Sequence, residues 1–114
     1  MRKLDGEQIL MRVFIGESDR WQHRPLYLAL IELFRREGLA GATVLRAVAG
    51  FGAGSVVHTA NILRHSADLP LVIEVVDPQE HLDRVLPQVD RMMGGGLITM
   101  EKVRVLKYEQ TGAG

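Results

Sequence analysis

The chain has 114 residues, 14 Lys and Arg against 14 Asp and Glu, and no cysteine. This length fits one compact domain, which we expect to span residues 1–114, with an ordered core at about 6–108 and a frayed tail at 109–114. Zero net charge argues against non-specific nucleic-acid binding, and the lack of cysteine excludes disulfides and thiol nucleophiles. Because no apolar stretch is long enough for a signal peptide or membrane span, we expect a cytoplasmic protein without membrane insertion.

The first half of the chain predicts a strand, a helix and a second strand. Apolar residues recur at alternate positions over 9–15, which indicates a strand. After a polar stretch, good helix formers at 26–37 predict a helix that ends at Gly38. The β-branched residues at 43–49 then predict a second strand.

The second half again predicts a strand, a helix and a strand. Residues 71–76 predict a strand, and apolar positions at helical spacing over 78–93 predict a helix that Pro87 should kink. Residues 97–108 predict a fourth strand. The order β-α-β-β-α-β indicates an α+β, ferredoxin-like fold: a four-stranded antiparallel sheet with both helices on one face.

The sheet face away from the helices is expected to remain partly apolar. We place on it Leu10, Arg12 and Phe14 from the first strand, Val44, Arg46 and Val48 from the second, and Val72, Glu74 and Val76 from the third. One charge between apolar residues on each strand fits a face buried against other copies of the chain, with ion pairs between subunits. The sequence therefore predicts a homo-oligomer.

Two glycine-rich segments are candidate binding loops. By spacing alone, the glycines at 50–54 and Asp77 imitate a dinucleotide fingerprint, but Ser55 replaces the third glycine and the chain is too short for that fold. Glycine backbone at 50–54 and at 94–96 could approach an anion, or it could simply end a strand and a helix. Both interpretations stay open.

The chain offers no catalytic constellation and no metal signature. His23, His58, His65 and His81 lack metal-ligand spacing, and the polar clusters, such as Ser55 with His58, lack a paired base and nucleophile. We therefore expect a protein that is not an enzyme, with no catalytic residues, no metal site and no required cofactor.

Several segments carry a family resemblance. They are residues 16–20 (GESDR), 25–27 (PLY), 38–46 (GLAGATVLR), 49–53 (AGFGA), 58–63 (HTANIL), 68–70 (DLP), 96–99 (GLIT) and 103–105 (VRV). Together they resemble domain-of-unknown-function family 190, an uncharacterised bacterial and archaeal family grouped with the PII-like proteins. The resemblance covers the chain from about 6 to 108.

This resemblance implies a PII-like trimer that binds adenine nucleotides in clefts between subunits. The residues that match the PII cleft are Gly50, Phe51 and Gly52 at the base of the loop, Gly94, Gly95 and Gly96 after the second helix, and Arg104 and Lys107 as C-terminal cations. The chain departs from the PII pattern at Gly95 and Leu97, where PII proteins have Asp and a phosphate-binding Lys.

The resemblance also implies a long flexible loop at 52–69, with Ser55, His58 and Thr59, that contacts a partner protein. Members of the family are often encoded beside a fluoride-export channel, so a membrane transport protein is one such partner. The expected function is a non-enzymatic signalling protein that binds a small anionic ligand, adenine nucleotides being one class. The alternative is a metal-responsive trimer of the same fold, in which His58, His65 or His81 would meet carboxylates across subunits.

Overall fold

The computed structural model describes residues 2–52, 58–59 and 68–110. Its main elements are β1 (Gly6–Gly16), α1 (Leu26–Arg36), β4 (Thr43–Arg46), β7 (Pro70–Asp77), α2 (Gln79–Met92) and β8 (Leu97–Val105). Two small ribbons accompany them: β2 (Arg20–Trp21) pairs with β3 (Arg24–Pro25), and β5 (Ala49–Gly50) pairs with β6 (His58–Thr59).

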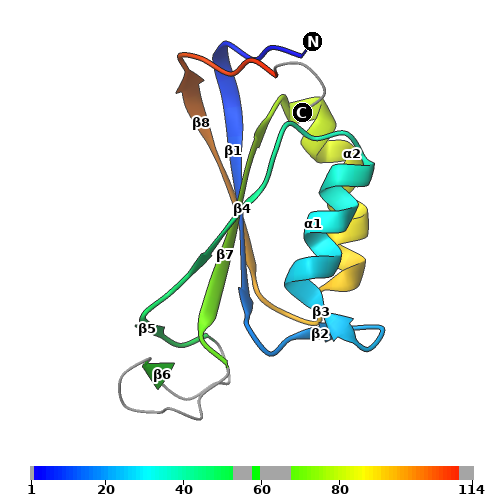
Figure 1. Ribbon diagram of the computed structural model, residues 1–114, viewed down its shortest axis with the longest axis vertical. Helices are drawn as coiled ribbons and strands as arrows, with labels where there is room; N and C mark the ends of the chain where they lie inside the picture. Colours follow the sequence, from blue (N-terminus) through cyan, green and yellow to red (C-terminus); the bar gives the residue numbers. More distant parts are fainter. Residues whose placement is uncertain (1, 53–57, 60–67, 111–114) are drawn as a thin grey trace.

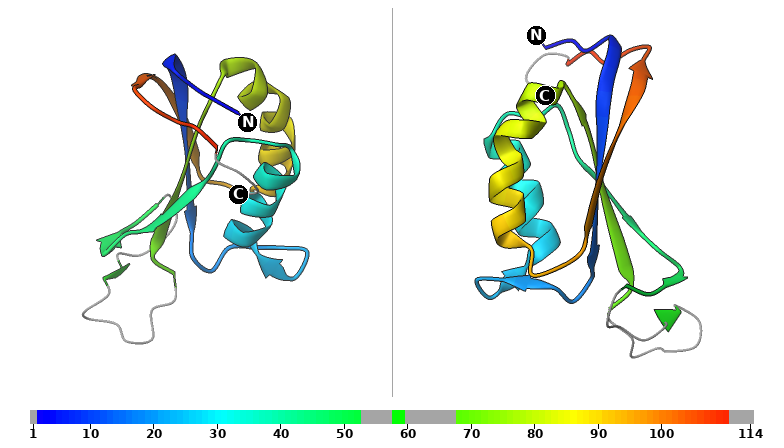
Figure 2. Two further views of the ribbon diagram at one scale, coloured as in Figure 1. Left: turned by 45° about the horizontal axis from the view of Figure 1, so that its top comes forward. Right: turned by 180° about the vertical axis from the view of Figure 1, so that it is seen from behind.

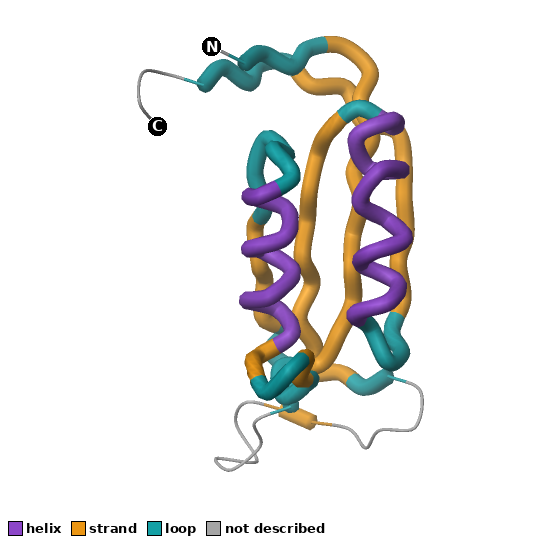
Figure 3. The backbone as a smooth tube through the Cα atoms, turned by 90° about the vertical axis from the view of Figure 1, so that its right-hand side faces the viewer, coloured by secondary structure: helices purple, strands orange, loops and turns teal. Residues whose placement is uncertain are grey.

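The four long strands form one antiparallel sheet in the order β4-β7-β1-β8. Both helices lie on the same face of this sheet, and the other face carries no helix (Figures 1 and 3). The expected α+β, ferredoxin-like fold is confirmed. The strands extend beyond the predicted bounds at β1 and β7, whereas β4 and β8 end earlier than expected.

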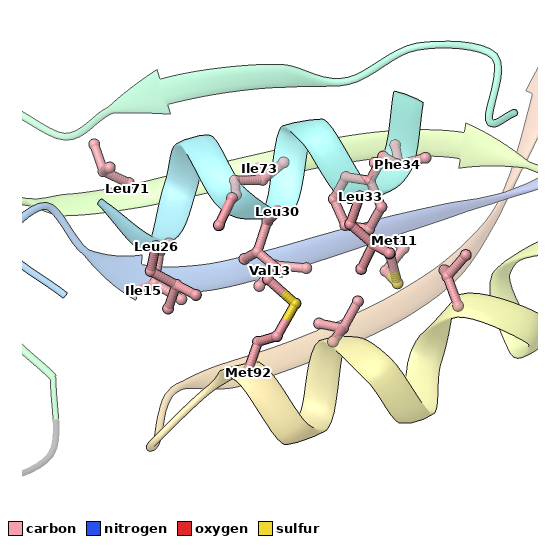
Figure 4. Packing of buried hydrophobic residues seen from close by; sticks show 14 of the residues in the cluster. Met11, Val13, Ile15, Leu26, Leu30, Leu33, Phe34, Leu71, Ile73 and Met92 are labelled. Atoms are coloured by element: carbon pink, nitrogen blue, oxygen red, sulfur yellow. The ribbon is translucent and has the colours of Figure 1, made fainter. Parts of the chain in front are cut away.

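The hydrophobic core fills the space between the sheet and the two helices (Figure 4). Alternate residues of β1 and β7, such as Val13 and Ile73, are fully buried against apolar positions at helical spacing on α1 and α2, such as Leu30 and Val85. Because every second residue of these strands faces the helices, the remaining positions of the same strands lie on the opposite face.

The two helices end as the sequence predicts, and α2 continues through its proline. Gly38 has φ +78°, and the amide of Leu39 donates to the Phe34 carbonyl at 3.0 Å, which closes α1 with a Schellman motif. Pro87 lies within α2, which runs from Gln79 to Met92, and it stands on the exposed side of the helix.

The sheet face away from the helices agrees with the sequence on two strands and differs on the third. Arg12 lies opposite Glu74 in the β1–β7 register, and its Nε donates to Glu74 Oε2 at 2.9 Å. A second hydrogen bond joins Arg12 to Glu101 at 2.5 Å. These bonds, to Glu74 first and Glu101 second, raise the pKa of Arg12 above its ordinary value. The ion pair expected between subunits is therefore satisfied within one chain.

The prediction for β4 is wrong by one residue. Thr43 pairs with Glu74 and Leu45 with Val72, so these two β4 residues share the outer face. Val44 instead packs against the core, and Arg46 pairs with Glu17 at 3.1 Å rather than with a neighbouring subunit. Val48 lies beyond the end of β4. Apolar residues stand at both 44 and 45, so the pattern alone could not decide the register.

Both ends of the described chain lie side by side at the end of the sheet where β1 begins (Figure 1). The amide of Leu4 donates to the Tyr108 carbonyl at 3.2 Å, and the amide of Gln110 donates to the Arg2 carbonyl at 3.0 Å. Lys3 and Glu109 form a β-bridge. The chain is thus still paired at 109–110, where the sequence predicted a loose tail, and residues 111–114 lie outside the described part.

Candidate ligand-binding groove

A groove of about 690 Å³ opens at the end of the sheet opposite the termini. It lies where β1 ends, where α2 passes into β8, and where Phe51 and Gly52 follow β5. Figure 2 shows the arrangement of these elements at this end of the molecule. Its lining residues are Phe14, Ile15, Gly16, Asp19, Arg20, Leu26, Phe51, Gly52, Asp68, Pro70, Gly94, Gly95, Gly96 and Leu97. This volume lies within the range of small-molecule sites.

The fold brings five of the predicted site residues to this groove from two distant segments. Phe51 and Gly52 follow β5, whereas residues 94–96 follow α2. Phe51 and Leu97 are 69% and 54% exposed, which leaves two large apolar side chains on the rim. An apolar rim of this kind can cover the face of a planar ring.

The three glycines at 94–96 differ in whether the fold of the chain requires glycine at their position. A Cβ on Gly96 would lie 2.6 Å from the Phe14 carbonyl, and its φ is +120°, so both packing and backbone require glycine there. A Cβ on Gly94 or Gly95 would meet nothing within 4 Å, and neither glycine has a left-handed φ. The folding of one chain therefore explains Gly96 and leaves Gly94 and Gly95 unexplained.

Gly50 has a structural role beside the groove. A Cβ there would lie 3.0 Å from Pro70 Cγ, and its φ is +154°. This glycine lets β5 pass close to the start of β7 and is not among the groove-lining residues. The approach to Pro70 and the backbone conformation therefore account for a glycine at position 50.

The polar part of the groove comes from residues that the sequence analysis did not select for the site. The amide of Ser18 donates to Asp68 Oδ1 at 3.1 Å, and the amide of Gly16 donates to Asp19 Oδ2 at 3.0 Å. A Cβ on Gly16 would lie 2.5 Å from Asp68 Oδ1 and 3.2 Å from Asp19 Oδ1, so both carboxylates converge on this glycine. The only sequence signals for Asp19 and Asp68 were that they lie in two segments of the family resemblance, residues 16–20 and 68–70.

Arg104 and Lys107 do not reach the groove of their own chain. Leu97 lines the groove at the start of β8, and Arg104 stands seven residues further along this strand, opposite Glu7 in β1. Seven residues of strand span about 23 Å. Lys107 lies beyond the end of β8. Within one chain these cations are therefore at the far end of the sheet.

The histidines do not form a metal site in the described part of the chain. His81 Nδ1 lies 2.7 Å from Asp77 Oδ1 near the start of α2, and the fully buried Asp77 also accepts hydrogen bonds from Arg2 and from the amide of Ala40. His58 lies in β6, beyond the other end of the sheet (Figure 1). Residues 2–52, 58–59 and 68–110 contain no group of three potential metal ligands.

The expected partner loop is only partly described. His58 and Thr59 form β6 and pair with Gly50 and Ala49 of β5. Ser55 and the rest of residues 53–57 and 60–67, including His65, lie outside the described residues. No helix in the described part of the chain is long and apolar enough to cross a membrane.

Residues 8–105 match the model of the domain-of-unknown-function family DUF190, described as an uncharacterized ACR. The chain belongs to this family. It is 35% identical over 97 residues to a UPF0166 protein of Aquifex aeolicus, which covers 85% of this chain and 91% of the relative. A UPF0166 protein of Methanocaldococcus jannaschii is 33% identical over 101 residues, which cover 88% of this chain and 93% of the relative.

The fold matches solved structures of PII-like proteins. A protein from Thermus thermophilus classed as PII-like superposes with a TM-score of 0.64 at 19% identity, covering 90% of this chain and 93% of its own. A second structure is CPII, a nitrogen regulatory PII-like protein from Thiomonas intermedia bound to ADP, AMP and bicarbonate. It superposes with a TM-score of 0.58 at 16% identity, covering 87% of this chain and 88% of its own. The DUF190 chain therefore has a PII-like fold.

Proposed function

We propose that this DUF190 protein is a cytoplasmic, non-enzymatic regulatory protein that binds an adenine nucleotide in the groove between residues 51–52 and 94–96. The nucleotide acts as a signal and not as a cofactor for catalysis. In this proposal three chains associate through the outer faces of their sheets, and the segment at 52–69 contacts a partner protein.

The observation that carries the proposal is the pair of open glycines in the groove wall. Gly94 and Gly95 have neither a steric nor a conformational reason to be glycine within one chain, yet both line a groove of ligand size. Such positions suit close approach of a ligand to the backbone. The exposed ring of Phe51 on the rim adds a surface on which a base can stack.

The PII-like fold supports a nucleotide as the ligand. CPII, which has this fold, is bound to ADP, AMP and bicarbonate. The fold shared with CPII suggests a class of ligand, and at 16% identity it does not transfer individual contacts to this chain. Adenine nucleotides are therefore the first ligands to test.

The outer sheet face supports association of the chains. Phe14 and Val72 lie opposite each other on this face, with Leu45 and Leu97 beside them. A sheet face with this apolar content is commonly covered by another subunit. Arg104 and Lys107, which lie far from the groove of their own chain, could then contribute to the groove of a neighbour.

The regulatory step follows from the position of the groove at the base of the 52–69 segment. Phe51 and Gly52 line the groove and lead directly into this segment. Ligand contacts at these two residues would change the conformations open to the segment and so its affinity for a partner. The family resemblance makes a membrane transport protein, such as a fluoride channel, the partner class that we propose.

Isothermal titration calorimetry against AMP, ADP, ATP and cyclic dinucleotides tests the nucleotide part. We expect heat with an adenine nucleotide and a loss of that heat in Gly95→Val, which adds bulk to the groove wall. Gly41→Val is the matched control, because Gly41 also has nothing within 4 Å of its Cβ position but does not line the groove. Absence of heat with every nucleotide would refute this part.

A further inference from the structure

The β2–β3 hairpin brings an arginine to the groove. Arg20, the first residue of β2, lines the groove, and among the lining residues that the structure describes it is the only Lys or Arg. The hairpin lies next to the start of α1, at the groove end of the molecule (Figure 1). Arg20 was not among the site residues predicted from the sequence.

The positive charge of Arg20 is not neutralised by an acidic side chain of its own chain. Residues 1, 53–57, 60–67 and 111–114 contain no Asp or Glu, so every acidic side chain belongs to the described residues. None of these acidic side chains forms an ion pair with Arg20. Arg20 Nη2 instead donates to the His23 carbonyl at 2.6 Å, and a guanidinium has further N–H donors for a ligand.

The backbone next to Arg20 is held by hydrogen bonds. The Asp19 carbonyl accepts from the Leu26 amide at 2.8 Å, and Asp19 Oδ2 accepts from the Gly16 amide at 3.0 Å. Asp68 also accepts a backbone amide from the stretch before β2. Because its backbone is anchored in this way, Arg20 has less conformational freedom to lose when a ligand binds.

The turn of the hairpin is strained. Gln22 and His23 have left-handed φ values of +49° and +65°, a conformation that is unfavourable for residues with a Cβ. The bond from Arg20 to the His23 carbonyl spans this turn. Strained backbone of this kind is concentrated at ligand-binding and active sites. An arginine on a strained, anchored hairpin beside a groove therefore suits the recognition of an anionic group.

We infer that Arg20 binds the phosphate of the ligand in this groove and so makes the protein distinguish a nucleotide from its nucleoside. The inference rests on the proposed function, because it concerns the ligand of the same groove. Cations that a neighbouring chain brings to the groove would act in addition to Arg20. Charge-assisted hydrogen bonds from an arginine to a phosphate contribute about tenfold or more in affinity.

The test is calorimetric titration of the whole protein with AMP, ADP and adenosine. Arg20→Ala removes the charge and its donors, whereas Arg20→Lys keeps the charge without the planar fork. Arg24→Ala is the matched control, because Arg24 pairs with Arg20's neighbour Trp21 in the same hairpin, bonds to Glu32 at 2.7 Å and does not line the groove. The fluorescence of Trp21, the only tryptophan of the chain, reports whether the hairpin is intact.

We expect Arg20→Ala to weaken AMP and ADP by about tenfold and adenosine by less than about twofold, with unchanged Trp21 emission. Arg20→Lys should lose less, and Arg24→Ala should bind all three as wild type does.

Three results would overturn the inference while leaving the proposed function in place. They are nucleotide affinity in Arg20→Ala equal to that of wild type, an equal loss for adenosine and the nucleotides, and an altered Trp21 emission that shows a purely structural role. If neither nucleotide bound to wild type, the proposed function and the inference would both fail.

Discussion

Within the groove wall, the fold requires glycine at one position and not at the two before it. Gly96 is held between the Phe14 carbonyl and the Met93 side chain, with Cβ contacts of 2.6 and 2.7 Å if alanine replaced it. Because the Phe14 carbonyl is backbone, it cannot move away as a side chain could. The glycine run after α2 therefore has one position that serves the fold and two that are available for a ligand.

We expect Gly96→Ala to lower the free energy of unfolding by at least about 2 kcal/mol, through backbone strain and steric overlap. Gly94→Ala adds a methyl group to open space and should change it by less than about 0.5 kcal/mol. Urea unfolding followed by circular dichroism measures both. Equal losses in the two variants would show that steric contact at Gly96 is not what distinguishes these positions.

A second prediction concerns Arg2 and the fully buried Asp77. Arg2 donates to this carboxylate and, at 2.6 Å, to the Gly38 carbonyl at the end of α1. Arg2→Ala leaves the Asp77 charge with fewer donors and should destabilise the protein by about 1–3 kcal/mol. Lys3→Ala is the control, because Lys3 is the next residue along the chain but is exposed. It should lower the free energy of unfolding by less than about 0.5 kcal/mol, measured by thermal or urea unfolding.

At the scale of elements, the two helices and the strands β1, β7 and β8 could be predicted because their apolar periods are strong. The alternation of β1 and β7 places Leu10 and Val72 on the outer face, as predicted. For β4 the period is short and ambiguous, so its face depends on pairing with β7, which the local sequence does not contain. The groove could not be predicted for the same reason. Asp19 and Asp68 are far apart in the sequence, and only the folded chain brings both of them to Gly16.

The β2–β3 hairpin could not be predicted from the sequence. Its turn has Gln22 at φ +49° and His23 at φ +65°, whereas such left-handed two-residue turns usually carry Asn and Gly. We expect the double change Gln22→Asn with His23→Gly to stabilise the protein by about 1 kcal/mol in urea unfolding. His23→Ala alone keeps a Cβ at the left-handed position and should give no gain; a stabilisation of the same size would contradict this explanation.

At the scale of the whole molecule, the sheet leaves one face without helices, and the proposed trimer covers it. Val72 lies on this face opposite Phe14 and Leu45. Val72→Lys should reduce the mass measured by light scattering at micromolar concentration without loss of the circular dichroism signal. The control is Leu28→Lys, at an exposed apolar position on α1. A monomeric wild type, or dissociation in both variants, would argue against association through the outer face.

The most direct test of a nucleotide-binding trimer is native mass spectrometry of the protein with added AMP. We predict a species of three times the 12.7 kDa chain mass that carries up to three nucleotides. A species that stays at the mass of one chain and carries no nucleotide would contradict the proposal.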